Sequence, residues 1–314
     1  MTGAALVSDT LLHLAVALDG AGRHTRVDAG SHPAYWAALA RTAERGLLDL
    51  VTIGGTRPAD GEHPDAALLV AYLAPLTRHV GLVPVLSAEP PQLVAATLAR
   101  LDQSSRGRGG WQPSAAAGLV EAVPAVHRLW DARAGAPRRE RPDGGAPRPS
   151  VGPQPPEGRP PVLVAATSAA DLAVAARVGD VVLVTPHDGA DAAGALDEVR
   201  AAEAAVGRTG PPLRVIADLA VALDGARETA ALACSPTELA DLLVSLWTEG
   251  FDGARLRPAT LPGDLLAIVD GVVPALQCHG VFRTAYGPAT LRARLGLGAR
   301  QDQAGNGAPD TVAV

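Results

Sequence analysis

Two neighbouring hydroxyl side chains, Thr167 and Ser168, give the clearest chemical signal in this chain. They lie where an apolar run, Val162–Ala166, passes directly into a helical pattern. The free N–H groups and the dipole at a helix N-terminus favour an anion, so a cofactor phosphate would suit this position. Alternatively, Ser168 is an ordinary helix cap, with Asp171 completing an S-x-x-D capping pattern. The residues alone favour the two interpretations equally.

Other candidate residues follow other apolar runs. Ser87 comes directly after VGLVPVL, and Trp111 with Gln112 ends the weak run Gly109–Gln112. A tryptophan at such a place is more often part of the core than a cofactor contact. His24 lies shortly after the first apolar run and is a weak catalytic candidate, because a solvated loop histidine is the commoner case.

Several kinds of chemistry are disfavoured or excluded. His24 and His187 are isolated, and Cys234 and Cys278 are the only cysteines, so we expect neither a metal site nor a disulfide framework. The fourth apolar run carries no carboxylate, which argues against a glycoside hydrolase. No nucleophile-elbow motif is present. All 27 basic residues are arginine, and the absence of lysine excludes Schiff-base enzymes.

These residues must be positioned by alternating strand and helix patterns. Eight apolar runs predict strands at 13–18, 50–53, 80–86, 109–112, 162–166, 181–185, within 213–223, and at 253–257. Helical patterns follow at 33–45, 65–76, 92–101, 115–130, 169–178, 190–205, after Ser235, and at 264–276. Ser235-Pro236-Thr237-Glu238 is a complete helix start signal, with a serine cap, proline at the first helical position and a capping glutamate. The alternation predicts a (β/α)8 barrel, with a doubly wound open sheet as the main alternative.

The organisation along the chain predicts one barrel domain over 1–296. It is interrupted by a Pro/Gly/Arg-rich excursion, Ala134–Pro161, of which we expect Pro137–Pro160 to lie outside the barrel, and it is followed by a disordered tail at 297–314. The chain has 314 residues, is 47% hydrophobic and carries a net charge of −6, with no basic tract near aromatic residues. We therefore expect no nucleic-acid partner. No apolar stretch reaches membrane-spanning length, and no signal peptide is recognised, so a cytoplasmic protein is expected.

Longer segments resemble a known family. They include HLAVALDGAGRH, AERGLLDLVTI, APLTRHVGLVPVLS, TLARLDQSSRGRGGW, VLVAATSAADLAVAARVGDVVLVTPHD and the C-terminal GARLRPATLPGDLLAIVDGVVPALQCHGVFRTAY. Together they resemble luciferase-like flavin-dependent oxidoreductases. The similarity is greatest to monooxygenases of the nitrilotriacetate and desulfurisation type, and it spans most of Leu12–Gly296.

The resemblance implies a barrel that binds reduced FMN from a separate flavin reductase and uses oxygen to oxidise a small organic substrate. A deazaflavin (F420) reductase of the same superfamily, and a homodimer, are also compatible with it. Phosphate-binding hydroxyls of the family match Thr167 and Ser168, and the strand end around Ser87 matches a stretch that faces the isoalloxazine. Gln112 stands where the family usually carries asparagine after Trp111.

The chain also departs from the family pattern. Ile53-Gly54-Gly55 replaces a stretch that commonly carries an acidic residue. After Trp111-Gln112 comes Pro113 and then almost directly a helix, whereas relatives carry a long excursion that helps to cover the active site. A second hypothesis is therefore a degenerate barrel that acts as a flavin-binding or interaction subunit without catalysis. The enzyme hypothesis is the one the resemblance favours.

Overall fold

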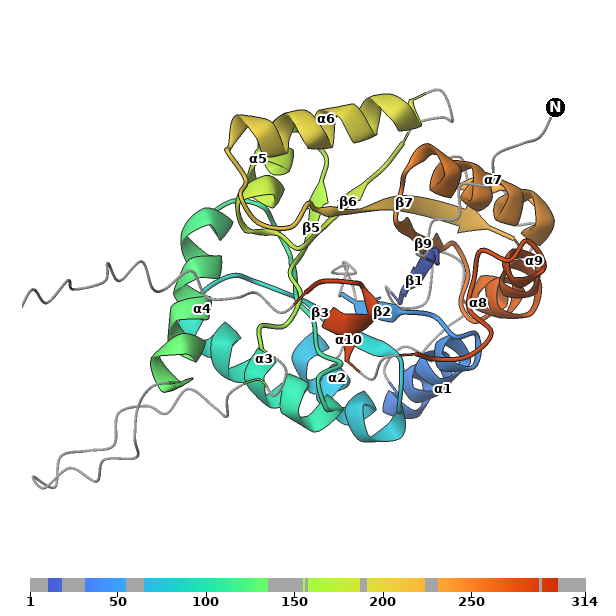
Figure 1. Ribbon diagram of the computed structural model, residues 1–314. Helices are drawn as coiled ribbons and strands as arrows, with labels where there is room; N and C mark the ends of the chain where they lie inside the picture. The colour runs from blue at the N-terminus through green and yellow to red at the C-terminus, as the bar shows by residue number, and fades with distance from the viewer. Residues whose placement is uncertain are drawn as a thin grey trace, which may run out of the picture.

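A computed structural model describes residues 11–18, 32–54, 65–134, 155, 158–186, 191–223, 231–287 and 290–298. Eight parallel strands form a nearly closed ring with helices around it (Figure 1). These strands are β1 (His13–Ala17), β2 (Leu50–Ile53), β3 (Gly81–Leu86), β4 (Gln112–Pro113), β5 (Leu163–Ala166), β6 (Val181–Val184), β7 (Arg214–Ala222) and β9 (Gly253–Pro258). Their order is β4-β3-β2-β1-β9-β7-β6-β5. The predicted (β/α)8 barrel is confirmed, and the open doubly wound sheet is excluded.

The seam of the ring lies between β4 and β5 and depends on the backbone of Trp111. Its N–H donates to the carbonyl of Pro161, and its carbonyl accepts from the N–H of Leu163, both at 2.8 Å. The described residues of the Pro/Gly/Arg-rich excursion, which are 134, 155 and 158–161, form no strand of the ring. The division into a domain at 1–296 and a tail at 297–314 stays a prediction, because 299–314 lie outside the described residues.

The helices follow the predicted order. They are α1 (Pro33–Arg45), α2 (Ala66–Leu73), α3 (Pro91–Ser105), α4 (Leu119–Ala134), α5 (Ala169–Val178), α6 (Ala192–Ala205), α7 (Pro236–Glu249), α8 (Gly263–Ala267), α9 (Val273–Cys278) and α10 (Leu291–Arg294). A short 3-10 turn, η2 (Ala74–Leu76), follows α2, and a π-helical turn, η3 (Ile268–Val272), joins α8 to α9. No helix within the described ranges is long and apolar enough to cross a membrane.

Two local features differ from the sequence-based expectation. Helix α4 begins at Leu119 rather than at residue 115, because Gly118 has a φ of 76°, a left-handed conformation that interrupts a helix. A two-residue strand, β8 (Leu232–Ala233), pairs in parallel with the end of β7. So short a strand has no periodicity that a sequence pattern could reveal. In contrast, Ser235 and Glu238 form the predicted capping box at the start of α7.

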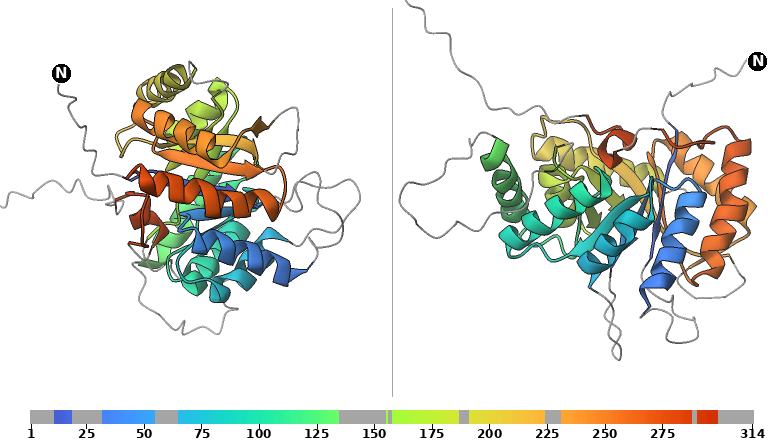
Figure 2. Two further views of the ribbon diagram at one scale, coloured as in Figure 1. Left: turned by 90° about the vertical axis from the view of Figure 1, so that its right-hand side faces the viewer. Right: turned by 90° about the horizontal axis from the view of Figure 1, so that it is seen from below.

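Side chains alternate between the helices and the lumen along each strand. The part of the lumen nearest the N-terminal ends of the strands is filled by apolar residues, among them Leu50, Val83, Leu163, Leu183 and Ile216. Helix α10 covers the N-terminal end of the barrel, where it lies over the centre of the ring (Figures 1 and 2). Its side chain Leu291 and the following Leu295 and Leu297 join the lumen cluster. This end of the barrel is therefore a packed core rather than an opening.

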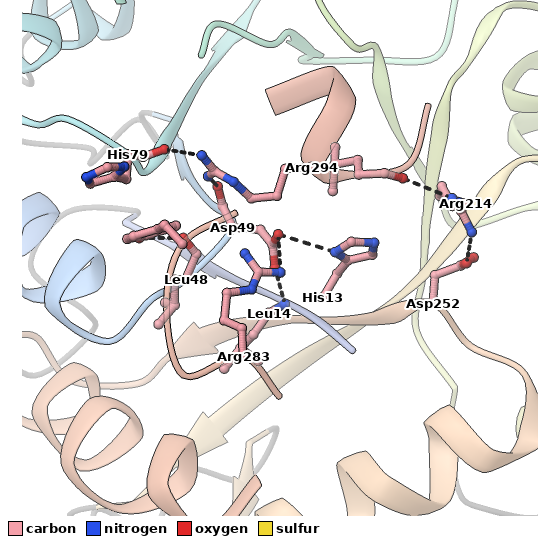
Figure 3. Close-up of polar contacts among 11 residues, drawn as sticks. His13, Leu14, Leu48, Asp49, His79, Arg214, Asp252, Arg283 and Arg294 are labelled. Atoms are coloured by element: carbon pink, nitrogen blue, oxygen red, sulfur yellow. Dashed lines mark hydrogen bonds and ion pairs between the residues drawn. The ribbon is translucent and has the colours of Figure 1, made fainter. Parts of the chain in front are cut away.

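The C-terminal segment is tied to this N-terminal end through buried Asp49, which is 1% exposed (Figure 3). The Asp49 carboxylate accepts hydrogen bonds from the backbone N–H of Leu14 at 2.9 Å and from Nη2 of Arg283 at 2.7 Å. Nδ1 of His13 lies 3.3 Å away. Burial alone raises the pKa of Asp49, but His13, Arg283 and the Leu14 N–H together hold it below its ordinary value.

Further contacts extend this attachment. Nη1 of Arg294 donates to the Asp49 carbonyl at 2.9 Å, and Nη2 donates to the His79 carbonyl at 2.7 Å. The Tyr286 hydroxyl donates to the carbonyl of Leu48 at 2.9 Å, and its ring stacks on His79. Because ligand sites in this fold lie at the opposite end of the barrel, we interpret the cluster around Asp49 as structural.

Candidate functional site

At the C-terminal end of the barrel, several of the residues that the structure describes are exposed to solvent. Lumen-facing residues near the strand ends are partly or fully exposed, whereas those one layer deeper are buried. The exposed or partly exposed ones are Val85, Ser87, Ala165, Thr167, Thr185, Ala220 and Arg257. We call this end of the barrel the mouth. In (β/α)8 barrels, ligand sites lie at this end, so the mouth is the candidate site.

The floor of the mouth is a hydrogen-bonded group of three side chains, Arg255, Asp218 and Gln112. Nε and Nη2 of Arg255 donate to the two carboxylate oxygens of Asp218, at 2.9 and 2.7 Å. Nη1 of Arg255 donates to Oε1 of Gln112 at 2.6 Å. Since β4 and β9 are opposite one another in the ring, Arg255 spans the lumen from one side to the other. The floor separates the mouth from the apolar layer beneath it.

Arg257 lies one layer above the floor, two residues further along β9. Its Nε is 3.4 Å from Oδ1 of Asp218 but makes no hydrogen bond with a described residue, and this atom is buried. The side chain as a whole is 41% exposed. Arg255 already binds both Asp218 oxygens, so Arg257 is the less completely paired of the two guanidinium groups.

Thr52 also faces the lumen, on β2. The residue is 1% exposed, and its hydroxyl oxygen has no hydrogen-bond partner among the described residues. Such a buried group carries a desolvation cost unless something binds it. Below the floor, a cavity about the size of one water molecule is lined mainly by apolar side chains, with His13, Asp49 and Arg255 as polar neighbours. It is far too small for an organic cofactor.

Thr167 and Ser168 lie together at the start of α5, as the sequence predicts. Oδ2 of Asp171 accepts three hydrogen bonds here: from the backbone N–H of Thr167 at 3.1 Å, from its hydroxyl at 3.0 Å and from the Ser168 hydroxyl at 2.9 Å. The Asp171 N–H donates back to the Ser168 hydroxyl at 3.2 Å. The Thr167 N–H and the two hydroxyls hold the pKa of Asp171 below its ordinary value.

The capping interpretation of Ser168 thus describes its contacts in this structure. The same geometry shows that three donors converge on one negatively charged oxygen. A phosphate oxygen has the same requirement, so the two interpretations involve the same donors. A phosphate would need these donors to leave Asp171.

The other predicted site residues lie in different environments. Ser87 is exposed above β3, where its hydroxyl accepts a hydrogen bond from the N–H of Glu89 at 3.3 Å. Gln112 belongs to the floor. Trp111 is 0% exposed and packs with the core on the helix side of the strands, which favours its interpretation as a core residue. His24 lies outside the described residues, as do His187 and Asp188.

The sequence patterns indicated Arg257 only as a strand end and left Arg255 and Asp218 unnoticed. A signal was present in Gly253–Pro258, where two arginines at alternate positions interrupt an apolar strand and must face the same side. Asp218 is likewise the one acidic residue within RVIADLAVA. The described residues contain no group of three or more His, Cys, Asp or Glu side chains able to hold a metal ion.

Comparison with known proteins finds similarity to luciferase-like monooxygenases. The family model described as luciferase-like monooxygenase matches residues 113–247. Nitrilotriacetate monooxygenase component A of Aminobacter aminovorans is 24% identical, with 84% of this chain and 89% of the relative covered. A pristinamycin IIA synthase chain of Streptomyces pristinaespiralis is 27% identical, with 91% and 96% covered. The chain is therefore similar to luciferase-like monooxygenases, and this similarity extends over most of its length.

Solved structures agree with the barrel fold of this chain. EDTA monooxygenase from Chelativorans sp. BNC1 superposes with a TM-score of 0.76 at 20% identity, covering 92% of this chain and 99% of the other. Long-chain alkane monooxygenase superposes with a TM-score of 0.71 at 17% identity, covering 96% and 97%. An F420-dependent secondary alcohol dehydrogenase has a TM-score of 0.65 at 12% identity, covering 85% and 99%.

This chain is shorter than the two relatives described above. The two alignments run over 405 and 407 residues, although the chain itself has 314. The relatives therefore carry insertions that are absent here. Within this chain, five residues separate Pro113 of β4 from Leu119 of α4.

Proposed function

We propose that the mouth binds reduced FMN and that the protein is a flavin-dependent monooxygenase acting on a small organic substrate. Luciferase-like relatives include monooxygenases for several different compounds, and this supports the reaction class. The bound flavin would supply the activation of oxygen. The chain would bind and orient the flavin and the substrate.

The observation that carries this proposal is the convergence of three donors at the start of α5. The N–H and hydroxyl of Thr167 and the hydroxyl of Ser168 meet at a single anionic oxygen, Oδ2 of Asp171. Hydrogen bonds of this kind to a charged acceptor contribute about 1.5–3 kcal/mol each. We propose that the FMN phosphate takes these donors from Asp171.

The mouth suits the ring system of a flavin. Ala165 and Ala220 face the lumen with short side chains and are partly exposed, in contrast to buried Leu163 and Ile216 one layer below. The unpaired hydroxyl of Thr52 offers a hydrogen bond at the same end. Ser87 and Gln112 lie at strand ends that border the mouth. We assign the isoalloxazine to this space, with Ser87 and Gln112 as polar contacts.

Partners follow from the same proposal. A relative is named as component A of nitrilotriacetate monooxygenase, which supports a separate component that reduces the flavin. We propose that a flavin reductase supplies reduced FMN here too, and that the chain works in the cytoplasm as a homodimer. The F420-dependent structural neighbour makes the deazaflavin F420 the alternative cofactor.

The test is FMN binding to the purified protein, measured by quenching of flavin fluorescence. Replacing Thr167 and Ser168 together by alanine should weaken binding by about tenfold or more, because two hydroxyl donors to the phosphate are lost. Ser235→Ala is the matched control. It removes a serine cap with the same 3.2 Å bond to the helix backbone, but at α7.

Equal FMN affinity in the wild type and in a folded double variant would contradict phosphate binding at α5. The same titration with F420 separates the two cofactors, since the preferred one should bind at lower concentration. Tight binding of F420 with no detectable binding of FMN would contradict the monooxygenase proposal.

A further inference from the structure

Among the described residues of the mouth, guanidinium groups outnumber carboxylates. Two guanidinium groups, those of Arg255 and Arg257, and one carboxylate, that of Asp218, face the lumen near the C-terminal ends of the described strands. Arg255 and Asp218 form a bidentate pair, which neutralises both groups and uses both carboxylate oxygens. The charge of Arg257 is therefore left over at the open side of the floor.

The placement of Arg257 suits ligand binding rather than support of the fold. Its Nε is buried without a hydrogen bond to a described residue, so the stem and the first nitrogen are fixed inside the barrel. The side chain is nevertheless 41% exposed, and its partner Asp218 lies below it, at 3.4 Å from Nε. A planar guanidinium held in this way can offer two parallel donors to a carboxylate.

We propose that Arg257 is the specificity-determining residue of this site and that it binds the anionic group of a carboxylate-bearing substrate. The proposal rests on the proposed function, since it assigns Arg257 to the substrate while α5 is left to the cofactor. Arg255, Asp218 and Gln112 act as positioning residues, because their hydrogen bonds fix the floor from which Arg257 rises.

The first experiment uses the full chain without flavin, so it does not depend on the cofactor. Succinate is the probe, and succinamide, which has the same shape but no charge, is its control. Binding is followed by the NMR signals of arginine Nε–H groups at constant ionic strength. We expect succinate, but not succinamide, to shift one arginine signal saturably. That signal should be absent from Arg257→Gln, and Arg257→Gln should bind succinate about tenfold more weakly or worse. Arg100→Gln, at an exposed position on α3, should bind as the wild type does.

FMN binding to the same variants separates this proposal from the proposed function. Equal FMN affinity in the wild type and Arg257→Gln, with succinate binding lost, supports a substrate site at Arg257. Loss of FMN affinity in Arg257→Gln, with FMN displacing succinate from the wild type, would show that Arg257 holds the cofactor and overturn the proposal. Equal binding of succinate and succinamide, or succinate binding that survives Arg257→Gln, would also overturn it. If succinate binds through Arg257 and FMN binds to no variant, the anion site stands and the proposed cofactor fails.

Discussion

At the scale of single residues, Asp171 places a negative charge on the donors that a cofactor phosphate would need. Removing it should strengthen FMN binding. Two unit charges 4 Å apart repel by roughly 1 kcal/mol in water, so Asp171→Ala should bind FMN about fivefold more tightly. Ser168 still caps the helix in this variant, because its bond comes from the backbone N–H of residue 171.

The stability of this variant should change in the opposite direction. An acidic side chain in the first turn of a helix stabilises it by about 0.3–1 kcal/mol, and Asp171→Ala loses this contribution. Thermal unfolding and FMN titration of the same samples provide the measurement. Asp197→Ala, at an exposed position on α6, makes the same change in net charge and should alter neither result in this way. Weaker FMN binding in Asp171→Ala would show that the carboxylate helps to hold the cofactor.

The residues of the site differ in how far the sequence reveals them. Thr167 and Ser168 could be proposed from the sequence because a strand-to-helix junction is a local pattern with a known chemistry, and their role as a phosphate site stays a prediction. Arg255 was missed because its role depends on Gln112, 143 positions away in the sequence, across the lumen. No periodicity connects two strands that meet only when the ring closes. The sequence does predict that Arg255 and Arg257 share a face, but not which charges oppose them.

At the scale of elements, the C-terminal segment is fixed to the barrel by the buried pair of Arg283 and Asp49, whose side chains are 8% and 1% exposed. Arg283→Gln leaves the Asp49 carboxylate with one charged partner fewer and should cost about 3–5 kcal/mol of unfolding free energy, as measured by urea denaturation. Arg45→Gln is the control. Its pair with Asp270 is 53% and 55% exposed, so its loss should cost about 0–1 kcal/mol. Equal losses in the two variants would mean that the buried pair does not hold this segment.

The same carboxylate should make the barrel sensitive to acid. The pKa of Asp49 is lower in the folded protein than its ordinary value of 3.8, so the unfolded chain takes up this proton first as the pH falls. The stabilisation of the fold by the ionised Asp49 carboxylate is therefore complete above about pH 4. It is lost as the pH falls towards the pKa of Asp49 in the folded protein. We expect Asp49→Asn to be less stable at neutral pH and to lose less free energy of unfolding between about pH 5 and pH 2. An unchanged acid slope in that variant would assign the effect to other carboxylates.

Element types and order were predictable because parallel strands buried on both faces read as apolar runs between amphipathic helices. The residues at which the helices and strands begin and end were harder to predict from the sequence. The start of α4 depends on the left-handed backbone of Gly118, and β8 is too short to show a period. The attachment around Asp49 was not predicted at all, since it joins a strand start to residues more than 230 positions later.

At the scale of the whole molecule, the chain lacks segments that its relatives possess, and one short connection borders the mouth. Exclusion of water is what couples oxygen use to substrate oxidation in such a site. We therefore expect uncoupled turnover, with hydrogen peroxide formed nearly in proportion to the reduced flavin consumed. Peroxide and oxidised product are measured together, with a flavin reductase supplying reduced FMN. Tight coupling would show that the site is covered, and loss of that coupling at a dilution that dissociates a dimer would assign the cover to the partner chain.

Because the ring closes between β4 and β5, the chain could begin at a different strand without changing the strand pairs of the barrel. The described chain starts beside the segment that carries α10, since the N–H of Leu12 donates to the carbonyl of Val281 at 2.9 Å. Both ends therefore emerge at the end of the barrel that α10 covers (Figure 2). In the sequence, residues 135–154 lie between α4 and β5. A circular permutant that joins 298 to 11 and opens between 135 and 154 would keep every strand pair of the ring. The barrel is then defined by which strands lie side by side. The same strands could be joined in a chain that begins at a different point.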